Sequence, residues 1–153
     1  MRKARFEDVP EILRLIERAI ERGCRDHYDE RQRRSVYLGY ASSLFIDALG
    51  PFETLVCEVR DRMVGAAQVD LAAGLLRALF VDTERQGHGL GRALLAAVES
   101  RALAAGCRQL VGAMSLNAVS FYRRAGFRLQ SVPQNIHGAY GPVPVQWMVK
   151  ALP

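Results

Sequence analysis

The fold is set by the stretch Asp82-Thr83-Glu84-Arg85-Gln86-Gly87-His88-Gly89-Leu90-Gly91-Arg92. It follows an apolar, strand-like segment and opens a long helical pattern, Gly89–Ala105, which we expect Gly106 to end. Its three glycines let the backbone approach a ligand closely, and a helix start offers unpaired amides and the positive end of the helix dipole. The segment therefore predicts an anion site, with Arg85 and Arg92 placed to add charge-assisted bonds.

The known phosphate motifs narrow the choice of anion. A Walker loop ends in Gly-Lys-Ser/Thr, which this segment lacks. The dinucleotide fingerprint fails because Arg92 stands at its third glycine position, and because the loop lies past the middle of the chain. By itself, the glycine-rich turn is equally compatible with a simple helix start.

A second segment makes the pattern specific. Residues 115–127 join a strand to a short helix and read Ser-Leu-Asn-Ala-Val-Ser-Phe-Tyr-Arg-Arg-Ala-Gly-Phe. Gln86-x-x-Gly89-x-Gly91 followed by Asn117-Ala118-x-x-Phe121-Tyr122-x-x-x-Gly126-Phe127 resembles the GCN5-related N-acetyltransferase (GNAT) family, and the gap of one helix, one strand and one turn also fits. The opening residues 2–8 and the pair Val64-Gly65 are similar to the corresponding parts of the family, so the resemblance spans essentially the whole chain.

The other elements follow from periodicity and turn chemistry. Asp8 with Glu11, and Asp29 with Gln32, have the spacing of capping boxes and predict two helix starts. The first helix should end near Gly23. A separate short helix is expected at Leu44–Leu49, stopped by Gly50-Pro51. Strands are expected at residues 1–6, 54–60, 63–71, 75–81, 109–114, 127–131 and 145–152, and a last short helix at 118–125.

This order predicts an α/β fold with a mixed, mostly antiparallel central sheet flanked by helices, in agreement with the GNAT-like acetyltransferase fold. At 153 residues we expect a single N-acetyltransferase domain, residues 1–153.

The resemblance implies a binding site for acetyl-coenzyme A. Phe80 and Val81 would end the fourth strand, whose backbone pairs with the pantetheine arm, and the amides from Gln86 to Gly91 would cradle the pyrophosphate. Asn117 matches a residue that hydrogen-bonds pantetheine, and Tyr122 matches one beside the sulfur. The expected cofactor-binding residues are Phe80, Val81, Gln86, Gly87, His88, Gly89, Leu90, Gly91, Arg92, Asn117 and Tyr122.

Three of these residues have structural alternatives. Asn117 is also a plausible helix N-cap, and Tyr122 could be a core aromatic. The position of His88 varies in the family, which favours an exposed loop residue over a catalytic one.

The chemistry implied is direct transfer of an acetyl group to an amine, with Tyr122 as the catalytic acid that protonates the leaving thiolate. Many relatives carry a glutamate base on the fourth strand, but Leu75–Val81 contains no carboxylate. The base is then water, or one of Glu58, Asp70, His27 and His137.

The acceptor is expected to be a small-molecule or peptide amine. Residues 24–30 and the polar loop 134–140 should shape its pocket, and Asp26, Asp29 and Glu30 predict an acidic entrance. A catalytically inactive coenzyme A-binding sensor is the alternative function. A nucleic-acid-binding module has little support, because the few aromatic residues are not interleaved with basic ones.

Composition sets the remaining expectations. The net charge of +5, almost all of it from arginine, suits a polyanionic ligand but does not identify one. Three separated cysteines favour neither disulfides nor a zinc site, so we expect no metal. No apolar run is long enough to cross a bilayer and no secretory signal is visible, which favours a cytoplasmic protein without membrane contact. The sequence is also compatible with a homodimer, since dimers are common in the family.

Overall fold

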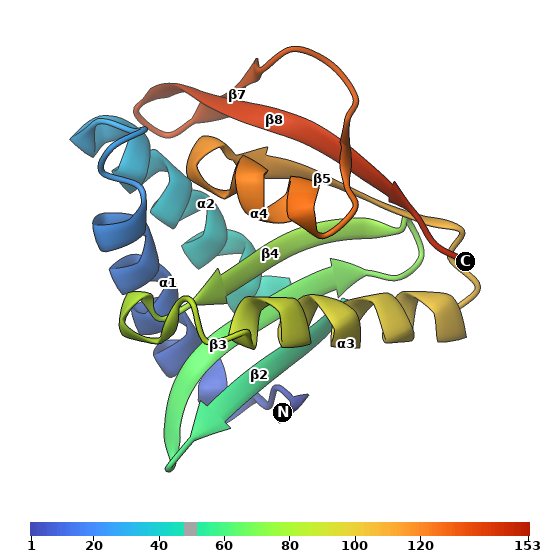
Figure 1. Ribbon diagram of the computed structural model, residues 1–153. Helices are drawn as coiled ribbons and strands as arrows, with labels where there is room; N and C mark the ends of the chain where they lie inside the picture. The colour runs from blue at the N-terminus through green and yellow to red at the C-terminus, as the bar shows by residue number, and fades with distance from the viewer. Residues whose placement is uncertain (48–51) are drawn as a thin grey trace.

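The computed structural model describes residues 1–47 and 52–153, which form a central sheet between two layers of helices (Figure 1). Helices α1 and α2 lie on one face, and α3 and α4 on the other. The helices are α1 (Val9–Gly23), α2 (Glu30–Asp47), α3 (Leu90–Ala104) and α4 (Val119–Arg124), with single 3-10 turns η1 (Phe6–Asp8), η2 (Thr83–Arg85) and η3 (Leu116–Ala118). The strands are β1 (Arg2–Lys3), β2 (Glu53–Val59), β3 (Arg62–Asp70), β4 (Leu75–Val81), β5 (Gln109–Ser115), β6 (Arg128–Leu129), β7 (Gln134–Gly138) and β8 (Gly141–Ala151).

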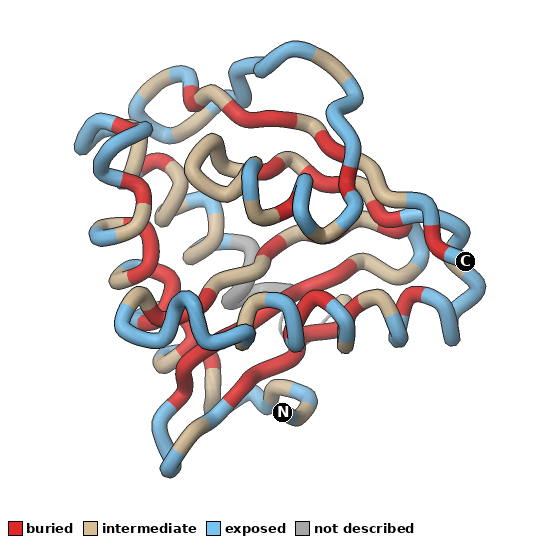
Figure 2. Tube along the Cα trace, in the orientation of Figure 1, coloured by how far each residue is buried: buried red, intermediate tan, exposed pale blue. Residues whose placement is uncertain are grey.

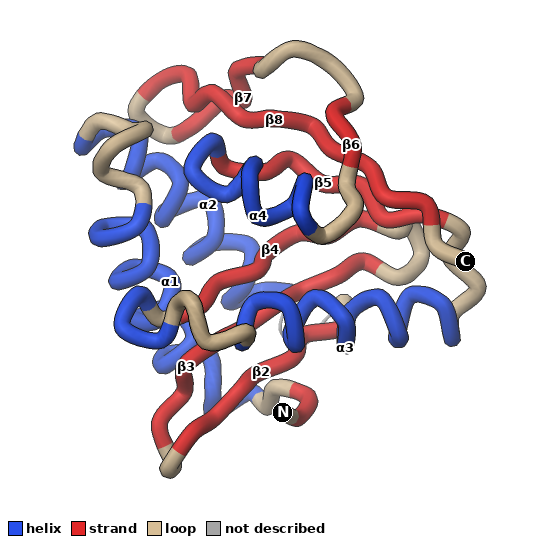
Figure 3. The backbone as a smooth tube through the Cα atoms, in the orientation of Figure 1, coloured by secondary structure: helices blue, strands red, loops and turns tan. Residues whose placement is uncertain are grey.

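The sheet consists of two antiparallel halves joined by one short parallel contact. Its strand order is β1-β2-β3-β4-β5-β8-β6, with β7 also pairing with β8. Between β4 and β5 the only registered pair is Leu75 with Val111, and beyond it the two strands diverge (Figure 3). The predicted mixed, mostly antiparallel fold is therefore confirmed, and it contains an open gap between two neighbouring strands.

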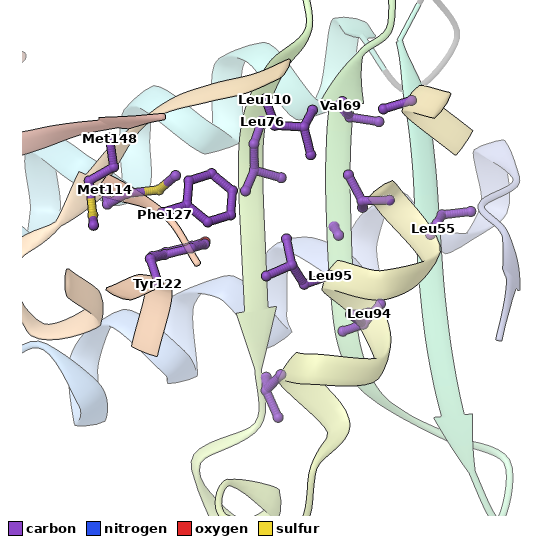
Figure 4. Packing of buried hydrophobic residues seen from close by; sticks show 14 of the residues in the cluster. Leu55, Val69, Leu76, Leu94, Leu95, Leu110, Met114, Tyr122, Phe127 and Met148 are labelled. Carbon is purple, nitrogen blue, oxygen red and sulfur yellow. The ribbon is translucent and has the colours of Figure 1, made fainter. Parts of the chain in front are cut away.

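Strands β2 and β3 are buried along most of their length (Figure 2). The two faces of the sheet bury different residues of these strands, as the two-residue period of a strand requires. Leu55 and Val64 face α3 and α4, whereas Val56 and Met63 face α1. Figure 4 shows the first of these cores, in which Leu94 and Leu95 of α3 pack over the strands. Burial on both faces explains why β2 and β3 read as nearly continuous apolar runs.

Of the two expected capping boxes, only one forms. Asp29 and Gln32 bond each other's backbone amides at 2.8 and 3.0 Å, as predicted. The predicted capping box at Asp8 and Glu11 does not form. Asp8 instead accepts two hydrogen bonds from the guanidinium of Arg2, at 2.7 and 2.9 Å, and Glu11 accepts one from the amide of Met63. The hydrogen bonds from Arg2 lower the pKa of Asp8 to about 2, so this carboxylate ties β1 to the start of α1.

Two further expectations need correction. Helix α2 continues without a break to Asp47, so a separate helix beginning at Leu44 was wrong, and the rest of that predicted helix lies outside the described residues. The expected polar loop at 134–140 is mostly strand β7, which forms a hairpin with β8. All residues of β7 are exposed or half-buried. The strand therefore has no buried face, and its sequence shows only a weak alternation of polar and apolar residues. Among the described residues, no helix is both long and apolar enough to cross a membrane.

Candidate functional site

The gap between β4 and β5 holds a small cavity of about 40 Å³. Residues from both diverging strands line it, together with one residue of α2 on one side and Ala118 and Tyr122 on the other. The gap therefore runs through the sheet and is reached by helices from both layers. The lining residues are Tyr40, Leu76, Arg77, Ala78, Leu79, Phe80, Ala113, Met114, Ser115, Ala118 and Tyr122.

The edge of β4 that faces this gap has unused backbone groups. The amide of Asp82 donates to the carbonyl of Val64 in β3 at 2.9 Å. Hydrogen-bonded and non-bonded pairs alternate along an antiparallel ladder, so the backbone groups of Leu79 and Val81 point away from β3, into the gap. The side chain of Gln86 already uses this edge, since its Nε2 donates to the carbonyl of Val81 at 3.4 Å. An extended ligand could add to β4 here as a further strand.

The glycine-rich loop lies at the open end of the gap, where β4 leads into α3. Gly87 and Gly89 both have φ of +80°, the left-handed region that favours glycine, and Gly89 is the N-cap of α3. The carbonyl of Gly89 accepts from Ala93 at 3.0 Å, but in the described part of the chain the amides from Gly87 to Gly91 donate to no backbone carbonyl outside the helix. The loop thus presents a row of exposed amides at a helix N-terminus, as predicted.

His88 and the flanking arginines are exposed, in agreement with the loop interpretation of His88. The ring Nδ1 of His88 lies 2.9 Å from the carbonyl of Gln86, which folds the side chain back on its own loop. Arg85 and Arg92 stand in solvent on either side of the exposed amides. The buried carboxylate of Asp82 fixes the start of the loop, because it accepts from the amide of Glu84 at 3.1 Å and from Arg62 at 3.1 Å.

Gly91 has a packing role that the sequence did not reveal. A Cβ at this position would lie 3.3 Å from the ring of Phe121 in α4 and 3.7 Å from Val81. The glycine therefore allows α3 and α4 to approach each other beside the end of β4. Phe121 is half-buried against the core, as expected for a residue that does not face the gap.

Asn117 sits in η3, the single turn between β5 and α4. Its side chain makes no N-cap hydrogen bond, so the structural alternative for this residue was wrong. Its Oδ1 instead accepts from the thiol of Cys24 at 3.4 Å, which leaves the amide N–H groups for another acceptor.

Tyr122 is both a core aromatic and a residue of the cavity. Its ring makes edge contacts with Phe121 and Phe127, at 5.0 and 5.3 Å between centroids. In Figure 4, Tyr122 lies beside Phe127. Its residue exposure is only 5 %, yet it lines the gap between β4 and β5. Burial raises the pKa of the hydroxyl, with a smaller contribution from Tyr40, so Tyr122 stays protonated at neutral pH.

Tyr40 and Arg77 belong to the site but were not singled out from the sequence. Tyr40 reaches the cavity from α2 and contacts the ring of Phe80 edge-on at 4.9 Å, and burial raises its pKa to about 12. Arg77 stacks over the ring of Phe52 at 4.2 Å, and its Nε donates to Gln68. Tyr40 reaches the cavity through a long-range contact between α2 and β4, and no local sequence pattern predicts that contact.

None of the four candidate bases lines the cavity. Glu58 pairs with Arg2 at 2.6 Å, and Asp70 accepts from the amides of Ala72 and Ala73 in the turn before β4. His27 and His137 are exposed, in the link between α1 and α2 and on β7.

A groove formed by α2 and the hairpin of β7 and β8 contains one of the three acidic residues expected at the acceptor entrance. Glu30 lies in this groove with two arginines, Arg31 and Arg34, and with Tyr140. The lining of this groove carries more positive than negative charge. Asp29 is occupied as a helix cap, and the acidic entrance stays a prediction.

The comparisons with known proteins agree with this geometry. The model of a family described as "Acetyltransferase (GNAT) domain" matches residues 41–141. The chain belongs to this family. It therefore contains an acetyltransferase domain of the GNAT type. No curated protein matches the sequence.

Solved GNAT structures share the fold over nearly the whole chain. A GCN5-related N-acetyltransferase from Rhodopseudomonas palustris has a TM-score of 0.91 at 23 % identity, covering 99 % of this chain and 94 % of that one. A PaiA N-acetyltransferase from Thermoplasma acidophilum, solved in complex with coenzyme A, has a TM-score of 0.81 at 17 % identity, covering 98 % and 96 %. A ribosomal-protein-alanine N-acetyltransferase from Brucella melitensis has a TM-score of 0.69 at 21 % identity, covering 99 % and 98 %.

Two glycines at opposite ends of α3 give a matched test of the loop. Gly89 and Gly106 have φ of +80° and +85°, and a Cβ at either would meet no atom within 4 Å. Alanine at either position should therefore cost the same left-handed strain, about 1–2 kcal/mol, and lower Tm to a similar extent. Only Gly89→Ala should weaken coenzyme A binding in calorimetry, by about tenfold or more, because only there does the new methyl group meet a bound phosphate. Equal affinities of the two variants would remove the loop from the binding site.

Proposed function

We propose that this chain forms a single acetyltransferase domain that binds acetyl-coenzyme A in the gap between β4 and β5 and transfers the acetyl group to a small-molecule or peptide amine. The observation that carries the proposal is that the gap, with unused backbone groups along β4, ends at a helix start with exposed amides. An extended arm with a pyrophosphate at one end fits such a surface. The Thermoplasma acidophilum N-acetyltransferase, which has the same fold and was solved in complex with coenzyme A, supports this choice of ligand.

Each part of the ligand has residues to receive it. The pyrophosphate would accept from the amides of Gly87 to Gly91, at the positive end of the α3 dipole, with Arg92 adding charge. The pantetheine amides would pair with the open edge of β4 at Leu79 and Val81, beside the ring of Phe80. The free N–H groups of Asn117 would donate to a pantetheine carbonyl from the opposite side of the gap.

The chemistry would take place in the cavity that Tyr122 and Tyr40 both line. Acetyl-coenzyme A supplies an activated carbonyl; the amine nitrogen bonds to this carbon, and the carbon–sulfur bond breaks. The hydroxyl of Tyr122 would give its proton to the departing sulfur and recover one from water. Burial raises the pKa of this phenol, but it also raises that of a thiol held in the same cavity, so the proton transfer does not become strongly uphill. Water would remove the amine proton, since none of the four candidate bases lines the cavity.

A coenzyme A-binding sensor without turnover is the second candidate function. The observation that favours it is the composition of β4, in which Arg77 is the one ionisable residue and no carboxylate is present to serve as a base. Its cofactor site would be the same, and only turnover separates the two functions.

Release of free thiol across a panel of amines decides between them. The panel should contain peptide N-termini, lysine derivatives, polyamines, amino acids and aminoglycosides, each assayed with acetyl-coenzyme A. We expect thiol release well above the rate of hydrolysis for at least one class. A protein that binds coenzyme A with micromolar affinity and releases thiol with none of them would be the sensor.

Tyr122→Phe tests the acid in the same assay. The variant keeps the ring and its edge contacts, so Tm and coenzyme A affinity should change little. With the best amine, kcat should fall by about 10²-fold, the usual contribution of a positioned acid. Because burial raises the pKa of Tyr122, wild-type kcat should show no loss on the alkaline side up to about pH 10, the ordinary tyrosine pKa. If kcat of the variant equals that of the wild type, water protonates the leaving sulfur and Tyr122 has only a packing role.

A further inference from the structure

Tyr28 joins three segments that are distant in the sequence. It lies in the link between α1 and α2, and only 3 % of its surface is exposed. Its hydroxyl donates to the carbonyl of Pro144 in β8 at 2.7 Å and accepts from the amide of Leu116 at 2.8 Å. One oxygen atom therefore connects the helical link, the last long strand and the turn that follows β5.

The partner on the third segment is the first residue of η3, directly before Asn117. The same turn is held a second time, because the thiol of Cys24, one helical turn before Tyr28, donates to Oδ1 of Asn117. Cys24 is 5 % exposed and packs with Tyr28 and Val143 in a small cluster separate from the two larger cores. The backbone and the side chain of the Asn117 turn are thus both fixed from the link between α1 and α2.

The hydrogen bonds of Tyr28 have no ready substitute. A partly buried backbone amide that loses its acceptor is destabilising, so without the hydroxyl the η3 turn would shift to find another acceptor for the amide of Leu116. Burial raises the pKa of Tyr28, which keeps the hydroxyl protonated and able to donate to Pro144 while it accepts from Leu116. The phenol ring itself packs against Val143, and phenylalanine would preserve that packing.

We propose that Tyr28 is a positioning residue for the donor site: its hydroxyl holds the Leu116–Ala118 turn so that Asn117 presents its amide N–H groups to coenzyme A. This inference rests on the proposed function, in which Asn117 binds pantetheine. It gives the link between α1 and α2, on the helical layer opposite α3 and α4, a direct part in cofactor affinity.

The test is Tyr28→Phe, with coenzyme A affinity measured by calorimetry and stability by thermal unfolding. We expect Kd to rise by about tenfold, and Tm to fall. Ser35→Ala is the matched control, since it also removes a buried hydroxyl that accepts from a backbone amide, here that of Tyr140 at 2.9 Å, and Ser35 does not line the gap. The control should lower Tm and leave Kd unchanged. A Tyr28→Phe variant with lowered Tm but wild-type Kd would make the hydroxyl purely structural and overturn the proposal.

A double-mutant cycle then asks whether Tyr28 acts through Asn117. In an Asn117→Ala background, Tyr28→Phe should change Kd by less than about twofold, because the group it positions is gone. Independent, multiplying effects of the two changes would contradict the proposal. If Tyr28→Phe does not fold, Cys24→Ala takes its place in the cycle. We expect Cys24→Ala to raise Kd by about threefold in the wild-type background and to leave Kd unchanged in the Asn117→Ala background. A Cys24→Ala variant with wild-type Kd would overturn the proposal. Wild-type protein that binds no coenzyme A would instead refute the proposed function itself.

Discussion

One short parallel contact, between β4 and β5, governs the architecture of the sheet and of the site within it. At this contact the strands approach so closely that a Cβ at Gly112 would lie 2.9 Å from the carbonyl of Leu76. Beyond it they separate, because β4 stays with β3 while β5 turns with β8. A sheet that opens in its middle exposes backbone groups that would normally be paired, and such groups need another partner. The gap is therefore a binding surface formed mainly by backbone groups, to which side chains add further contacts.

The layers of helices convert this gap into a site with two sides. The start of α3 supplies exposed amides at its open end, and α4 supplies Tyr122 from the same layer. Helix α2 supplies Tyr40 from the opposite layer, where the acceptor amine would enter. Donor and acceptor could thus meet through the sheet, which agrees with direct transfer between two bound molecules.

Local patterns were sufficient to predict most of the architecture. The glycines at 87, 89, 106 and 126 all have positive φ, as their places in the loop and at two helix ends required. The strands from β2 to β5 were predicted to within one residue at either end, because β-branched and apolar runs between clear turns leave little ambiguity. The paired motifs around Gly89 and Asn117 then indicated the family, which the family match confirmed.

What the sequence could not reveal depends on contacts between distant segments. Asp8 and Glu11 have the spacing of a capping box, but the carboxylate of Asp8 binds the Arg2 guanidinium and makes no cap hydrogen bond to α1. Asn117 looked like an N-cap until the structure placed Cys24 beside it. Tyr28 and Tyr40 carry no local signal, because their partners on β8, η3 and β4 are distant in the sequence.

Amide hydrogen exchange with and without coenzyme A asks most directly whether the open edge of β4 and the loop after it form the cofactor site. Exposed amides without partners exchange rapidly, and a ligand that accepts from them should slow their exchange. We expect protection at Leu79 and Val81, from Gly87 to Gly91, and around Asn117, with little change on β2 or at the groove near Tyr140. If coenzyme A binds and exchange at the β4 edge and the glycine loop stays unchanged, the cofactor site lies elsewhere on the molecule.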